Sequence, residues 1–80
     1  MNWIDIEKTK TFPNENETVW LYCAKDKTVF LGCHVYLNNE GWFWAQSNGN
    51  IYNENGKIVS ECDIEDLNVT HWCSIPELPK

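Results

Sequence analysis

Hydrophobic and polar side chains alternate with a period of two along most of this chain, a pattern typical of strands rather than helices. Five segments are predicted as strands, at residues 3–6, 18–24, 28–37, 41–47 and 67–75. A polar stretch at 8–17, broken by Pro13, connects the first two. Because proline cannot donate a ladder hydrogen bond, Pro76 and Pro79 place the end of the last strand near Ile75.

Short polar or glycine-containing links between the segments predict turns. They lie at residues 25–27, 38–41, 48–49 and 55–56. The last two are Asn-Gly pairs, in which both residue types tolerate a positive φ, so each predicts a tight hairpin. The acidic residues 61–66 predict a loop or one helical turn. We therefore expect a mainly β fold, in which five or six antiparallel strands form a curved sheet or small barrel with little helix.

The alternation assigns one face of the two central strands to the core. That face holds Val19, Leu21, Cys23, Val29, Leu31, Cys33 and Val35. The other face is aromatic and holds Trp20, Tyr22, Phe30, His34, Tyr36 and one of the Trp42/Trp44 pair. In an open sheet these rings form a stripe that contacts a partner, whereas in a closed one they pack under the terminal segments as a second core. Gly32 favours the second arrangement, because a ring or backbone can approach it closely.

Size and composition add limits to this picture. Eighty residues make one domain, residues 1–80, with a small core. Five Trp, three Tyr and three Phe exceed what such a core needs, so some rings remain for a surface. The net charge is −6 and the chain has no Arg, which argues against direct nucleic-acid binding and against a membrane-surface role. An acidic protein is suited to a basic partner.

The predicted acidic contacts lie close together in the sequence. They are Glu61, Asp63, Glu65 and Asp66. A solvated loop that keeps the protein soluble is the simpler interpretation of this segment. The functional interpretation is a patch that competes with nucleic acid for a basic protein surface.

Four cysteines and two histidines are the candidates for metal and catalytic chemistry. The N-terminal residues lack the pattern of a secretory signal, so we expect a cytoplasmic protein with four reduced cysteines. A Cys23–Cys33 disulfide fits a hairpin, but that compartment argues against it. The cysteines are dispersed, and His71-x-Cys73 is one close pair on a shared face, which is insufficient for zinc. We expect no metal and no cofactor, with buried free thiols instead.

No nucleophile elbow, phosphate-binding loop or metal-hydrolase motif is present, so we expect a protein without enzymatic activity and without catalytic residues. The thiols lie on apolar faces of an acidic chain, whereas a cysteine nucleophile needs a base and a positive setting.

Both ends of the chain resemble a family of small phage and prophage proteins that is known only as a domain of unknown function. The matching residues near the C-terminus are Val69, Thr70, His71, Trp72, Pro76 and Pro79, in a V-T-H-W-x-x-x-P-x-x-P ending. Near the N-terminus, Trp3 opens a W-I-x-V-like pattern, and Phe12-Pro13 matches a later L-P step. Cys73, Ser74 and Leu78 depart from the family, which tends to have Met, Pro and Pro there. The resemblance implies a phage-type origin and a small β fold, with structural roles for the motif.

These observations favour a non-enzymatic protein-binding module. The leading hypothesis is an inhibitor of a bacterial defence complex, similar in action to anti-CRISPR proteins, whose acidic surface occupies a nucleic-acid-binding site on a host protein. It would act in the host cytoplasm as a monomer or weak homodimer. One alternative is a structural or replication-accessory phage protein that self-associates through an edge strand. A second is a small zinc-stabilised module.

Overall fold

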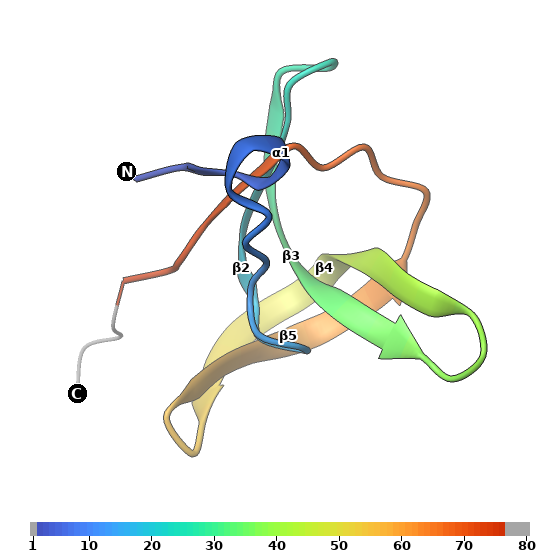
Figure 1. Cartoon of the computed structure of the whole chain (residues 1–80). Helices are drawn as coiled ribbons and strands as arrows, with labels where there is room; N and C mark the ends of the chain where they lie inside the picture. The colour runs from blue at the N-terminus through green and yellow to red at the C-terminus, as the bar shows by residue number, and fades with distance from the viewer. Residues whose placement is uncertain (1, 77–80) are drawn as a thin grey trace.

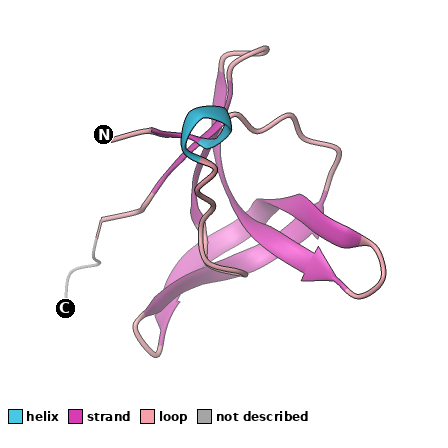
Figure 2. Cartoon of the chain, viewed as in Figure 1, coloured by secondary structure: helices cyan, strands magenta, loops and turns pink. Residues whose placement is uncertain are grey.

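The computed structural model describes residues 2–76 and contains one six-stranded antiparallel sheet. Its elements are β1 (Ile4–Asp5), α1 (Ile6–Thr9), β2 (Val19–Cys23), β3 (Thr28–Leu37), β4 (Gly41–Glu54), β5 (Lys57–Ile64) and β6 (His71–Cys73). The predicted class, a mainly β fold with a curved sheet and little helix, is confirmed (Figure 2). Pro79 lies outside the described residues.

Strands β2 to β5 form a meander of hairpins, and the last strand returns to the beginning of the chain. The order across the sheet is β1-β6-β2-β3-β4-β5, so β6 pairs with β1 on one side and β2 on the other (Figure 1). Near the far edge, the Thr18 amide donates to the Ile58 carbonyl at 2.8 Å. This bond draws β5 toward the start of β2 and curls the sheet.

The hairpin predicted at Asn55-Gly56 is confirmed, because both residues have positive φ, 54° and 83°, between β4 and β5. The turn predicted at Asn48-Gly49 is wrong. Both residues lie inside β4, where the pairing with β5 shifts register between Ser47 and Ile51. The strand bulges there rather than reversing, and the Asn48 side chain donates across the ladder to Asp63.

Two other boundaries differ from expectation. Most of the acidic segment predicted as a loop or one helical turn belongs to β5, because Cys62 and Ile64 pair with Ser47 and Ala45 of β4. The loop begins only at residue 65 and runs to 70. The last strand is therefore three residues long, shorter than the predicted range 67–75.

The assignment of faces in the first hairpin is wrong for β3. Cys23 pairs with Thr28 and Leu21 with Phe30, because four residues, Ala24 to Lys27, make the turn instead of three. A shift of one residue moves every side chain of a strand to the other face. The predicted core residues Val29, Leu31, Cys33 and Val35 consequently lie opposite those of β2, and Val29 is 52% exposed.

The main core forms where β2, β3 and β6 meet. Val19, Leu21 and Trp72 are buried together, and Ile4, Ile6, Phe30, Trp44 and Val69 pack against them. Gly32 makes this packing possible, since a Cβ there would lie 2.1 Å from the Ala45 carbonyl oxygen and 2.7 Å from Leu21 Cδ1. The close approach predicted for this glycine is thus present.

Candidate functional site: an aromatic cluster between acidic grooves

Three aromatic rings contact the imidazole of His34 on one face of β3 and β4, and a fourth ring contacts one of these three. We name these five residues the His34 cluster: Phe12, His34, Tyr36, Trp42 and Trp44. The ring centroids of Phe12, Trp42 and Trp44 lie 5.0, 4.4 and 4.3 Å from that of His34. Phe12 and Trp42 are stacked on it, with interplanar angles of 10° and 16°. Tyr36 contacts Trp42 at 5.3 Å.

Strand register and one loop assemble the cluster. His34 pairs with Trp44 and Tyr36 with Trp42, and directly paired residues share a face. Phe12 arrives from the connection between α1 and β2, which is tied to β3 because the Asn16 amide donates to the His34 carbonyl oxygen at 3.0 Å. The connection thereby places a ring over the imidazole.

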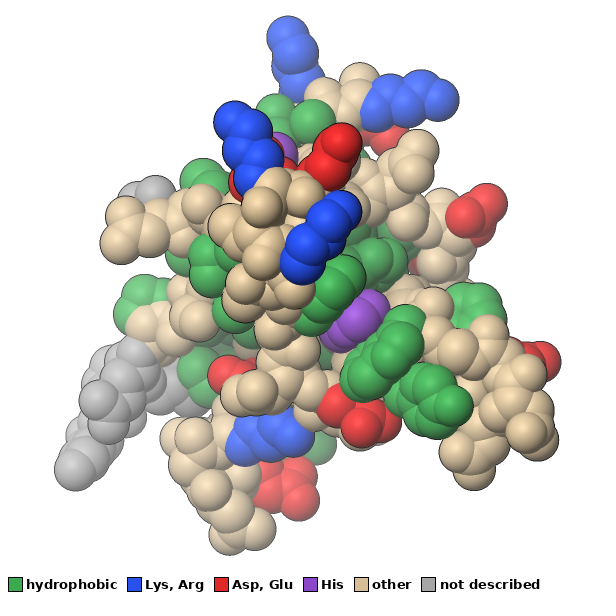
Figure 3. Space-filling model, in the orientation of Figure 1, with side chains coloured by type: hydrophobic (Ala, Val, Ile, Leu, Met, Phe, Trp, Pro, Cys, Tyr) green, Lys and Arg blue, Asp and Glu red, His purple; other side chains and the backbone are tan. Residues whose placement is uncertain are grey.

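The cluster is buried at its centre and exposed at its rim. His34 is 6% exposed, whereas Trp42, Phe12 and Tyr36 are 53, 48 and 46% exposed. Figure 3 shows hydrophobic side chains beside a histidine on this face of the molecule, with acidic side chains nearby. On ordinary protein surfaces, exposed apolar residues are scattered singly. A cluster of exposed aromatic side chains is instead typical of an interaction surface.

Burial sets the charge of the imidazole. The pKa of His34 is lowered from 6.5 by desolvation, while the charge of Glu15 raises it in part. The ring is therefore neutral at pH 7 and acts as another flat, uncharged surface in the stack. Glu15 lies near the cluster, because it lines the same groove as His34.

Two grooves meet at Trp42, one with a single acidic side chain and the other with two. One, of about 430 Å³, is lined by Phe12, Pro13, Asn14, Glu15, His34 and Trp42. The other, of about 420 Å³, runs along Trp42 and Trp44 to Glu65 and Asp66. The Glu65 amide donates to the Trp44 carbonyl oxygen at 3.3 Å, which holds the start of the loop beside the ring.

The structure divides the predicted acidic contacts into two pairs. Glu65 and Asp66 lie next to the His34 cluster. Glu61 instead lines a separate groove with Tyr52, and Asp63 accepts a hydrogen bond from Asn48. All four side chains are exposed.

The predicted aromatic contacts are divided as well. Tyr36 is in the His34 cluster, whereas Phe30 packs against the core. Trp20 and Tyr22 pair with Leu31 and Val29 and so lie on the opposite face of the sheet. Sequence patterns suggest Glu15 only as a possible extension of the acidic patch and do not identify Phe12 as a contact, because the fold of the connecting loop brings both to β3.

Comparison with known protein families identifies the family of this chain. A family model described as "Protein of unknown function (DUF551)" matches residues 2–80. The chain belongs to the DUF551 family. This confirms the part of the resemblance that pointed to an uncharacterised family, while the phage origin stays a prediction. No curated protein and no solved structure matches the DUF551 chain.

The T-H-W step of the DUF551 chain joins strands at the other end of the sheet. The Thr70 hydroxyl donates to the Tyr22 carbonyl oxygen at 3.1 Å and accepts from the Ala24 amide at 3.1 Å. His71 Nδ1 lies 2.8 Å from this hydroxyl, and its Nε2 lies 3.5 Å from an Asp5 carboxylate oxygen. The row of Asp, His and Thr resembles a catalytic triad, but the hydroxyl is engaged by the backbone of β2 and its following turn.

Other residues of the motif lie around this junction. The Trp72 indole donates to the Thr11 carbonyl oxygen at 2.9 Å, and Val69 packs on the core. The Trp3 and Tyr22 rings lie 5.8 Å apart, and Pro76 is exposed. The backbone amide of Lys8 lowers the pKa of Asp5, with a smaller contribution from the charge of His71.

The cysteines of the DUF551 chain are all free thiols, and burial raises the pKa of three of them. That of Cys33 rises to about 12, chiefly through desolvation and then through Cys62 beside it. Cys23 and Cys33 lie on opposite faces of the hairpin, so the geometry considered for their disulfide is wrong. Within residues 2–76 no three His, Cys, Asp or Glu side chains form a metal-ligating group.

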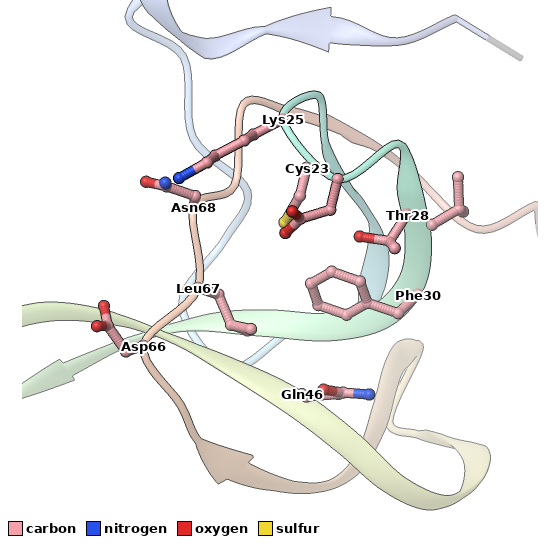
Figure 4. A pocket seen from close by; sticks show the side chains of 10 residues that line it. Cys23, Lys25, Thr28, Phe30, Gln46, Asp66, Leu67 and Asn68 are labelled. Carbon is pink, nitrogen blue, oxygen red and sulfur yellow. The ribbon is translucent and has the colours of Figure 1, made fainter.

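Another hollow, of about 700 Å³, lies under the loop that leads to β6. Figure 4 shows the Phe30 ring and the Leu67 side chain inside it, with the Lys25 amine beside the Asn68 amide. Its polar side chains come from three segments and carry both signs of charge. In the described part of the DUF551 chain, no helix is long and apolar enough to span a membrane.

Proposed function

We propose that this chain is a non-enzymatic binding module that holds a basic surface of a partner protein against the His34 cluster. The observation that carries the proposal is the meeting of half-exposed aromatic rings and carboxylates at Trp42. Aromatic side chains dominate the energy of protein interfaces, and charges at the rim steer a partner of opposite sign. The net charge of −6 extends that attraction beyond the contact.

The finer proposal concerns the partner and the source of the chain. A protein surface rich in Lys and Arg is typically one that binds nucleic acid, so an acidic module that covers it excludes the nucleic acid. We propose a phage or prophage origin and a host target of this kind, with a defence complex such as a CRISPR effector as the leading candidate. Small size, acidity and the absence of Arg support this proposal.

Affinity purification from a bacterial host, followed by identification of co-eluting proteins, tests the partner class. The expected partner is a protein with a basic, nucleic-acid-binding surface. Its binding should weaken as salt rises, because exposed charges are screened. A partner with an acidic or uncharged contact surface, or affinity that is independent of salt, would contradict the proposal.

Two double variants with the same change in charge locate the contact. Glu65→Lys with Asp66→Lys should weaken binding by roughly tenfold or more, because both side chains border Trp42 and reversal creates repulsion. Glu61→Lys with Asp63→Lys is the matched control on β5 and should weaken it less. Equal losses would mean that net charge acts without a defined site.

A second candidate function, self-association, is favoured by one observation. Strand β5 is eight residues long and ends the sheet, so part of its backbone is available to pair with another chain. Light scattering distinguishes the two functions: a dimer that grows with concentration supports self-association, and a monomer at all concentrations rejects it.

A further inference from the structure

The geometry points to a subsite for one arginine side chain of the partner, in the groove between Phe12, Glu15, His34 and Trp42. We name it the Trp42 groove. The inference deepens the proposed function and rests on it, because it names the group that the aromatic cluster recognises.

Three aromatic rings with nearly parallel planes line the groove. His34 is stacked against both Phe12 and Trp42, so the three ring planes are aligned within 16° of that of His34. Trp42 is 53% exposed, which leaves much of its indole available to a ligand. A guanidinium group is planar and stacks on aromatic faces, and tryptophan is the best partner for a cation.

The groove supplies one negative charge for the cation. Glu15 lines it, and its charge acts on the His34 ring. Within residues 2–76 the Glu15 carboxylate forms no ion pair. The nearby Lys57 ammonium donates to the Glu15 backbone carbonyl oxygen at 2.8 Å. The buried imidazole is neutral and does not repel a cation.

Arginine fits these features better than lysine. Its guanidinium is weakly hydrated and can face an aromatic ring while its edge donates to a carboxylate. A lysine ammonium is compact and strongly hydrated, so it gains less from flat walls. The groove volume of about 430 Å³ accommodates the guanidinium and its methylene groups.

The test uses small probes and the full chain. We would titrate the protein with N-acetyl-arginine amide and follow the indole and histidine ring signals by NMR. N-acetyl-citrulline amide, which has nearly the same shape without the charge, and N-acetyl-lysine amide are the comparison ligands. The arginine probe should shift the signals of Trp42 and His34 in a saturable way, and citrulline should not.

Matched variants assign the effect to the groove. Trp42→Ala should weaken the arginine probe by about 2- to 30-fold, the range expected for a cation on an aromatic ring. Tyr52→Ala is the control, because Tyr52 is similarly exposed at 49% and lies outside the groove. Glu15→Gln should weaken binding without removing a ring, with Glu61→Gln as its control, and it serves also if Trp42→Ala does not fold.

Each outcome decides the inference. Preference for lysine, equal binding of citrulline, or losses in the control variants would overturn it. If no probe binds while a basic partner still binds in a manner that depends on Glu65 and Asp66, the arginine subsite is wrong and the proposed function stands. If the basic partner does not bind either, the proposed function fails as well.

Discussion

The two ends of the sheet treat their aromatic residues in opposite ways. At the β1–β6–β2 end, Trp72 is buried in the core and its indole donates to the backbone. At the β3–β4 end, Trp42 is half exposed and its ring contacts are with His34 and Tyr36. The first arrangement contributes to stability, whereas the second leaves apolar surface in water that a partner can cover. The comparison indicates that structure and recognition depend on different tryptophans.

The largest expected effect contrasts these two residues directly. Trp72→Ala should lower the free energy of unfolding by about 3–5 kcal/mol, because it removes a large buried side chain from a small core. Trp42→Ala should lower it by about 1 kcal/mol or less, since most surface substitutions have small effects. Urea unfolding followed by circular dichroism measures both.

Similar losses in the two variants would break the comparison. They would mean that the His34 cluster is a second core and that its exposed rings contribute as much to stability as the buried ones. A larger loss for Trp42→Ala than for Trp72→Ala would also mean that the cluster is structural, and it would remove the basis for proposing the cluster as a binding surface.

Gly32 lies on β3 between the two ends and should show the second largest effect. An alanine Cβ there would overlap the Ala45 carbonyl oxygen, so Gly32→Ala should destabilise the protein by about 1–3 kcal/mol. Gly49→Ala is the control, because nothing lies within 4 Å of its Cβ position and its backbone needs no positive φ. Thermal unfolding of both variants tests the prediction, and an unchanged melting temperature for Gly32→Ala would contradict it.

The smallest expected effect is a dependence of stability on pH that comes from His34. The pKa of His34 is lowered in the folded state from 6.5, chiefly by desolvation and against the charge of Glu15. The unfolded state therefore binds more protons just below pH 6.5, and this contribution to stability is complete above that pH and falls as the pH drops. Urea titrations between pH 5 and 8 measure the loss.

The variants separate this loss from other titrations. His34→Phe keeps an aromatic ring in the stack and should remove the pH dependence, while His71→Gln should keep it. The lowered pKa of Asp5 acts in a different window, because its stabilisation is lost only as the pH falls below about 3.8. If the pH dependence disappears in His71→Gln and persists in His34→Phe, its source is the β1–β6–β2 end of the sheet and the prediction for His34 is wrong.

The sequence predicts strand positions better than it predicts which faces meet. The period of two located β3 at residues 28–37, as the structure has it. The faces of β2 and β3 depend on one more fact, whether the turn has three residues or four, and no local pattern determines it. A single residue, Ala24, thus decides that Cys33 does not share a face with Cys23.

The candidate site was predictable to a similar extent. Alternation places His34 and Tyr36 on one face and Trp42 and Trp44 on one face of the next strand, and the β3–β4 register unites them. The place of Phe12 and Glu15 depends on tertiary hydrogen bonds of the loop after α1. The separation of Glu65 and Asp66 from Glu61 and Asp63 depends on where β5 ends, a boundary that local composition obscured.

The position of β6 has a consequence for the order in which the strands can pair. Strands β2 to β5 follow one another in the chain and can pair as successive hairpins. Strand β1 cannot join them at that stage, because its partner is β6, which also closes on β2. The first strand therefore pairs only after β6 is in place, and this contact between distant parts of the chain should make the last step of folding slow relative to hairpin formation.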